Sequence, residues 1–196
     1  MTRSEQKEKR RWDIIKAGLH FFVRKGYEAT KISEIAEKAG MSVGLLYHYF
    51  ESVEALYEAL IDIGLSGRSG QYFPEYDNPL DYFSKSAAFA FDAIKRNPFI
   101  AEIFLLMNQA EKNPDLPQKF RDKLGQNHVI TTSVSLIEEG QRLGIIREGS
   151  PASLSIAFWL SIQGYAEMIA LHPDTPYPET EWFVDILRAR EVKTHD

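Results

Sequence analysis

Residues 30–50, TKISEIAEKAGMSVGLLYHYF, decide the fold of the N-terminal part of this chain. Apolar residues such as Ile35 and Leu46 recur at helical spacing on both sides of Gly40. Glycine takes the left-handed backbone of a tight turn without a steric penalty, and Ala36 is small enough for two short helices to cross closely. The spacing therefore predicts a helix–turn–helix. Helix pairs of this kind also occur in bundles, so a unit that reads DNA and a plain packing motif both remain open.

Helix-spaced apolar residues continue on both sides of this stretch. Before it, one helical face is formed by Trp12, Ile15, Leu19 and Phe22, and Gly26 is placed to end that helix. The next three helices have candidate N-caps, which are Thr30 for a helix through Ala39, Ser42 for the third helix and Ser52 for the fourth.

The C-terminal two thirds show the same helical periodicity. Helices are expected after Pro79, after Asn97-Pro98, from about Pro117 to Leu143, from Ser150-Pro151 to about Leu171, and from Glu179 to about Glu191. No segment alternates with the period of two that strands require. We therefore predict an all-α fold of about nine helices.

Composition places the chain among soluble globular proteins. Of the 196 residues, 44% are hydrophobic and 26% are charged, and none is cysteine. The absence of cysteine excludes disulfides, thiolate metal sites and a cysteine nucleophile. No apolar run reaches the roughly 20 residues that a bilayer crossing needs, and the charged segment 1–11 does not resemble a signal peptide. We expect a cytoplasmic protein that does not bind a membrane.

Charge is distributed unevenly along the chain. The net charge is −5, yet residues 1–48 contain ten Lys and Arg against six Asp and Glu, a balance of +4. The remaining residues, 49–196, therefore carry 13 basic and 22 acidic groups, a balance of −9. A basic head on an acidic body suggests that a polyanion binds the head, with a solvated helical face as the alternative.

A longer stretch, FFVRKGYEATKISEIAEKAGMSVGLLYHYF at residues 21–50, followed by Glu54-Ala55-Leu56, resembles the N-terminal domain of the TetR family of bacterial transcriptional regulators. The resemblance is specific over about residues 10–60 and extends beyond residue 65 only to helix number and order. It implies a helix–turn–helix DNA-binding domain at residues 1–52 and a ligand-binding and dimerisation domain at residues 53–196.

The function that the resemblance implies is a ligand-responsive repressor. It would bind palindromic double-stranded operator DNA as a homodimer and be released or modulated by a small, mostly hydrophobic effector. One helix–turn–helix reads few base pairs, and two recognition helices about 34–36 Å apart would read a palindrome.

The resemblance also assigns residues to the DNA contact. Thr30 would cap the second helix and offer its hydroxyl and backbone N–H to a phosphate, and Gly44 would allow close approach to the bases. The full implied set is Thr30, Ser42, Val43, Gly44, Leu45, Tyr47, His48 and Tyr49.

One position departs from the family pattern. The lysine that usually begins the fourth helix and binds phosphate is Val53 here, with Glu51 and Glu54 beside it. We expect weaker DNA affinity as a result. Basic residues near the N-terminus could compensate by reaching over the DNA backbone, and these are Arg3, Lys7, Lys9, Arg10 and Arg11.

The resemblance also implies that the last two predicted helices form the dimer interface. The final one is apolar on more than one face, which is more than packing on its own subunit requires. The predicted interface residues are Leu154, Phe158, Ile162, Tyr165, Trp182, Phe183, Ile186 and Leu187. Burial within the subunit is the alternative.

Candidates for the effector pocket combine large apolar side chains with a few polar groups. They are Phe104, Met107, Asn108, His128, Thr131, Thr132, Phe158, Trp159, Gln163 and Met168. Each of them could equally be part of the core or, for His128, an exposed polar residue.

An enzyme is the rival class of function. The five histidines form no His-Glu-x-x-His or Glu-x-x-His motif, and no Gly-x-Ser-x-Gly, phosphate-loop or dinucleotide motif occurs. We therefore expect no catalysis, no metal and no cofactor. A helical dimeric small-molecule-binding or interaction protein with weakened DNA binding stays open because of Val53 and Glu54. Salt-dependent binding to duplex DNA would distinguish it from a regulator.

Overall fold

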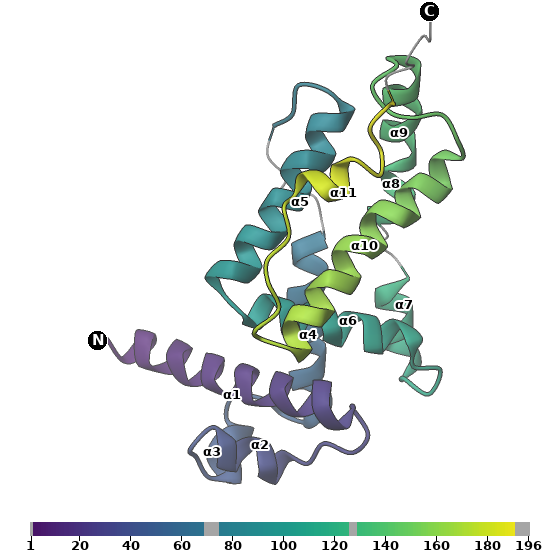
Figure 1. Cartoon of the computed structure of the whole chain (residues 1–196). Coiled ribbons are helices and arrows are strands. Elements are labelled where there is room, and N and C mark those ends of the chain that lie inside the picture. Colours follow the sequence, from purple (N-terminus) through teal and green to yellow (C-terminus); the bar gives the residue numbers. More distant parts are fainter. Residues whose placement is uncertain (1, 69–74, 126–128, 191–196) are drawn as a thin grey trace, which may run out of the picture. The chain divides into compact units, whose positions relative to one another are not determined.

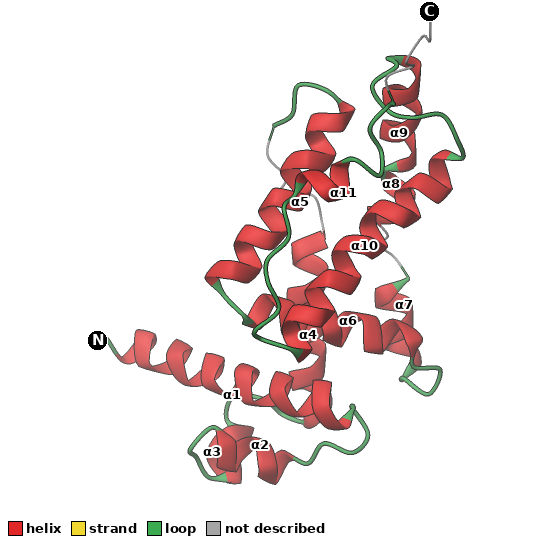
Figure 2. Cartoon of the chain, viewed as in Figure 1, coloured by secondary structure: helices red, strands yellow, loops and turns green. Residues whose placement is uncertain are grey.

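The computed structural model describes residues 2–68, 75–125 and 129–190. These residues form helices and connecting loops (Figure 2), and within them only an isolated backbone bridge between Ile146 and Arg188 has the geometry of a strand pair. The prediction of an all-α fold is confirmed.

The chain packs into two compact units. The first comprises Met1–Gly67 with Glu102–Asn127, and the second comprises Arg68–Ala101 with His128–Asp196. The predicted boundary at residue 52/53 divides a DNA-binding domain from a ligand-binding domain, and it does not coincide with the division into packing units. It stays a prediction.

The first unit contains the N-terminal helices and a later pair (Figure 1). Its helices are α1 (Arg3–Lys25), α2 (Ile32–Lys38), α3 (Val43–Tyr47), α4 (Val53–Arg68), α6 (Phe99–Lys112) and α7 (Gln118–Leu124). Ile14, Leu19, Ile35, Leu46 and Leu56 are fully buried in this unit. Hydrophobic burial of these side chains holds the three N-terminal helices and α4 together.

The second unit contains α5 (Pro79–Arg96), α8 (Val129–Thr132), α9 (Val134–Arg142), α10 (Pro151–Leu171) and α11 (Glu181–Val184). Its core is largely aromatic. Phe83 of α5 packs edge-on against Phe158 of α10 with ring centroids 4.9 Å apart, and Phe91 lies 5.0 Å from Phe183 of α11. Aromatic pairs in this geometry add to the stability gained from buried area.

Most predicted helix ends are confirmed. Gly26 ends α1 with φ of 82°, and the hydroxyls of Ser42, Ser52 and Ser150 accept backbone N–H groups at the starts of α3, α4 and α10. Thr30 as the cap of α2 is wrong, because Lys31 occupies the N-cap position. The Thr30 hydroxyl instead donates to the carbonyl of Gly26 at 2.7 Å.

Two predicted helices and the predicted burial of Trp12 are also wrong, whereas Ile15, Leu19 and Phe22 are buried as predicted. The helix from Pro117 to Leu143 is interrupted, since α7 ends at Leu124 and α8 is separated from α9 at Ser133. There the Ser133 hydroxyl donates to the carbonyl of Val129 at 2.8 Å, and such bonds compete with the helical ladder.

The last helix is a single turn rather than a helix to Glu191. After α11, the Arg147 N–H donates to the Leu187 carbonyl at 2.8 Å and the Ala189 N–H donates to the Ile145 carbonyl at 3.0 Å. The backbone therefore pairs with an earlier loop instead of continuing the helix. Trp12, placed by its spacing on the apolar face of α1, is exposed.

Candidate nucleic-acid interface

The turn between α2 and α3 fixes the orientation of α3. Gly40 has φ of 66°, its N–H donates to the Glu37 carbonyl at 3.0 Å, and the Met41 N–H donates to the Ala36 carbonyl at 3.0 Å. These two bonds form a Schellman motif, which requires a left-handed residue at the position of Gly40. The next residue but one, Ser42, caps α3 by accepting the Leu45 N–H at 3.2 Å.

One face of α3 is buried and the other is open. Leu46 and, after the helix, Phe50 face the core of the first unit. The side chains of Ser42, Tyr47 and His48 are exposed, as is Gly44. Val43, Leu45 and Tyr49 are half-buried. The structure therefore brings seven of the eight predicted DNA-contacting residues onto or beside one exposed helical face.

Because Gly44 has no side chain, another molecule can come closest to the backbone of α3 at this residue. A Cβ atom built at Gly44 would meet no other atom within 4 Å, so its surface is open. Tyr47 is 48% exposed and stands one turn away. An open backbone flanked by hydroxyl groups suits contact with base edges and phosphates.

Thr30 is the exception. Its side chain is buried, its hydroxyl donates to Gly26 and its N–H donates to the Tyr27 carbonyl at 3.3 Å. Both donors are thus used inside the first unit, where they hold the loop between α1 and α2.

Glu54, at the start of α4, has a partner that the sequence pattern did not predict. Lys119 of α7 lies 2.7 Å from Glu54 and 3.2 Å from Glu58. One turn further along, Lys123 lies 2.8 Å from Glu58 and 2.7 Å from Asp62. We call these five residues the charge ladder. The acidic residues of α4 and the lysines of α7 each recur at i, i+4 spacing, which is visible in the sequence. Nothing local in the sequence indicates that the two sets face each other.

The charge ladder is reflected in the ionisation of its members. Hydrogen bonds from Lys123 and Lys119 lower the pKa of Glu58, and the hydrogen bond to Glu54 raises the pKa of Lys119. Beside it, Phe120 of α7 packs edge-on against Tyr57 of α4 with centroids 5.3 Å apart. Burial raises the pKa of Tyr57 to about 12. Both polar and aromatic contacts therefore attach α7 to α4.

The predicted effector-pocket residues are not gathered in one unit. Phe104, Met107 and Asn108 lie on α6 in the first unit, whereas Thr131, Thr132, Phe158, Trp159, Gln163 and Met168 lie in the second unit. His128 lies outside the described residues.

Several of these side chains have packing roles. Phe158 is fully buried against Phe83, and the Trp159 indole N–H donates to the Ser133 hydroxyl at 2.9 Å. Two surface hollows in the described structure have other linings. One, of about 320 Å³, includes His20 and Lys38, and the other, of about 380 Å³, includes Arg190. The pocket stays a prediction.

The predicted dimer residues mostly face the core of their own unit. Phe158, Ile162, Phe183 and Leu187 are buried, Leu154, Tyr165 and Ile186 are half-buried, and Trp182 is 63% exposed. The exposed apolar residues of α10 are different ones, and we call them the α10 surface: Ile156, Leu160, Met168 and Leu171. Because α10 is apolar on all sides, its sequence lacks the alternation of apolar and polar residues that would distinguish its buried face from its exposed face.

Known proteins share both the head and the helical body. Residues 14–60 match the model of the bacterial regulatory proteins of the tetR family. The transcriptional repressor KstR2 of Mycolicibacterium smegmatis is 26% identical over 168 residues, which cover 82% of this chain and 81% of KstR2.

Solved structures show the same fold. PfmR, a TetR family transcriptional regulator from Thermus thermophilus, has a TM-score of 0.64 and 25% identity, covering 91% of this chain and 98% of PfmR. AibR in complex with isovaleryl coenzyme A and operator DNA has a TM-score of 0.64 and 18% identity, covering 90% of this chain and 94% of AibR. With this head and this helical body, the chain belongs to the TetR family of bacterial transcriptional regulators.

Proposed function

We propose that the protein is a repressor that binds a palindromic operator as a homodimer and is modulated by a small, mostly hydrophobic effector. The observation that carries the proposal is the exposed face of α3, where Ser42, Gly44, Tyr47 and His48 lie free of the core. A helix presented in this way fits the major groove of duplex DNA.

The dimer would form through the α10 surface rather than through the residues that the sequence pattern selected. Contrary to the expectation from the sequence, one helix, Pro151–Leu171, is long and apolar enough to cross a membrane, and only 28% of its apolar window is buried. A second copy of the chain covering this surface accounts for its hydropathy in a cytoplasmic regulator without a membrane.

An effector would act by favouring a conformation that cannot bind the operator. A preference of a few kcal/mol is sufficient to change operator occupancy strongly. AibR supports this part by analogy, since it has been captured with both operator DNA and isovaleryl coenzyme A. The effector of the present chain is proposed only as a small, mostly hydrophobic molecule.

Binding to duplex DNA tests the proposal directly. The wild-type protein is expected to select a palindromic sequence from a random duplex library, and Tyr47→Ala or Gly44→Glu should each abolish binding without changing the oligomeric state. Tyr76→Ala is the matched control, because Tyr76 is an equally exposed tyrosine in the other unit. Operator affinity that survives both changes on α3 would contradict the proposal.

The second candidate is a dimeric small-molecule-binding or interaction protein with weakened DNA binding. It is favoured by Val53, which stands where the family places a phosphate-binding lysine. A wild-type protein that retards no duplex at low salt, with or without extracted metabolites, would favour this candidate over the repressor.

A further inference from the structure

The first turns of α1 extend beyond the hydrophobic core. Each residue from 2 to 10 is exposed, whereas Ile14 and Ile15 are fully buried. The helix nevertheless begins at Arg3 with a complete capping box, in which the Glu5 N–H donates to the Thr2 hydroxyl at 3.2 Å and the Thr2 N–H donates to the Glu5 carboxylate at 2.8 Å. This part of the helix is therefore held by its cap rather than by core packing.

Four of the five cations in residues 1–11 gather on one side of this exposed part. At 100° per residue, four cations fall within an arc of about 100°. They are Arg3, Lys7, Arg10 and Arg11, and we call them the basic stripe. Ile14 lies in the same arc, so the stripe continues the buried face of α1 outward past the core. Glu5 lies on the opposite side of the helix, and Glu8 lies outside the arc, about 60° beyond Arg11.

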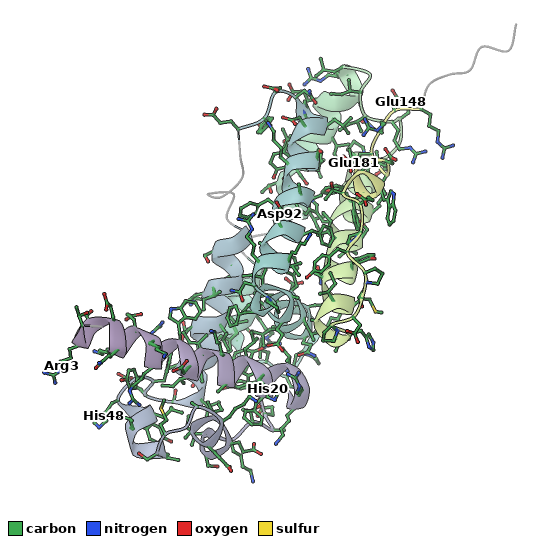
Figure 3. The ribbon with its side chains drawn as sticks, turned by 60° about the vertical axis from the view of Figure 1, so that its left-hand side comes forward. Arg3, His20, His48, Asp92, Glu148 and Glu181 are labelled. Carbon is green, nitrogen blue, oxygen red and sulfur yellow. The ribbon has the colours of Figure 1, made fainter. Side chains whose placement is uncertain are left out.

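The basic stripe runs beside the recognition helix. Its innermost member, Arg11, places its guanidinium 5.1 Å from the centre of the Phe50 ring, three residues beyond the end of α3. Figures 1 and 3 both show α3 next to the N-terminal half of α1, with the first turns of α1 extending past it. In Figure 3, Arg3 and His48 lie on the same side of the unit.

We propose that the basic stripe binds the sugar–phosphate backbone of duplex DNA next to the bases that α3 contacts. This inference rests on the proposed function and adds a second contact surface to it. From Arg3 to Arg11 the helix spans about 12 Å, so the stripe can contact more than one phosphate. Lys and Arg side chains are the usual phosphate ligands, and these four replace the cation missing at Val53.

A charge-matched pair of double variants tests the stripe. Lys7→Gln/Arg10→Gln removes two cations from the stripe, and Lys16→Gln/Lys112→Gln removes two exposed cations outside it, one on the other side of α1 and one on α6. Operator affinity is measured by fluorescence anisotropy between 50 and 200 mM salt, on the duplex selected by the wild-type protein. Circular dichroism checks that both variants keep the wild-type helix content.

The stripe variant should lose at least tenfold in affinity, and the slope of log affinity against log salt should fall by about 0.9 for each phosphate contact removed. The control variant should keep the wild-type slope. Equal salt slopes for the two variants would overturn the proposal that the basic stripe binds DNA and would leave the proposed function intact. A wild-type protein that binds no duplex would overturn the proposed function itself.

Discussion

Gly40 and Gly44 differ in backbone conformation although they lie only four positions apart in the sequence. Gly40 has a positive φ of 66°, whereas Gly44 lies within the helical turn of α3 with an open surface. A side chain at Gly40 is therefore strained by its backbone, and one at Gly44 is not. The same substitution at the two positions should have opposite effects on stability.

Gly40→Ala is expected to lower the free energy of unfolding by roughly 1–2 kcal/mol, the cost of a left-handed non-glycine residue. Gly44→Ala should raise it by about 0.5–1 kcal/mol, because alanine loses less conformational entropy in a helix. Urea denaturation followed by circular dichroism measures both values.

Gly44→Ala should also weaken operator binding, since its methyl group would occupy the surface that we propose lies nearest the bases. A stabilised Gly44→Ala variant with wild-type affinity would show that α3 does not approach DNA through this residue. The pair therefore separates a residue needed for folding from one needed for recognition.

At the scale of elements, the charge ladder connects α7 to the start of α4. Lys119→Gln is expected to reduce operator affinity, because it leaves Glu54 without its partner at 2.7 Å, next to the proposed DNA contact. The double variant Lys119→Gln/Glu54→Gln should recover much of that affinity, since the unpaired carboxylate is gone. Anisotropy titrations of Lys119→Gln, Glu54→Gln and the double variant complete a double-mutant cycle.

Lys112→Gln is the control, as it removes an exposed lysine from α6 that is outside the ladder. Equal affinities for Lys119→Gln and Lys112→Gln would show that the ladder stabilises the unit without affecting DNA binding.

How far the sequence predicts each element depends on the range of the interactions that determine it. Ser42, Ser150 and Gly26 were predictable as helix ends because a cap involves only neighbouring residues. The break at Ser133 was not, since there the Ile130 carbonyl accepts the Ser155 hydroxyl from 25 residues away at 2.6 Å. The helix–turn–helix followed from local spacing and the residues of its exposed face from the family resemblance, whereas the partner of Glu54 comes from a distant helix.

At the scale of the whole molecule, the proposed dimer depends on which residues of the α10 surface are free to contact a second copy. Leu160 is 48% exposed near the middle of that surface, and Phe183, which the sequence pattern placed in the interface, is buried against Phe91. A charge at Phe183 would disrupt the core, so it cannot test dimerisation. A charge at Leu160 can, because it leaves the core unchanged.

Leu160→Lys is therefore expected to yield a folded monomer in sedimentation experiments, whereas the wild-type protein is expected to sediment as a dimer. Desolvating an unpaired ammonium in an apolar interface costs more than the interface gains from one leucine. Phe89→Lys is the matched control, because Phe89 is an exposed apolar residue of α5 outside the α10 surface, and this variant should remain dimeric. Operator affinity should fall with the dimer, since one head reads only half of a palindrome. A dimeric Leu160→Lys protein with wild-type affinity would place the interface elsewhere on the chain.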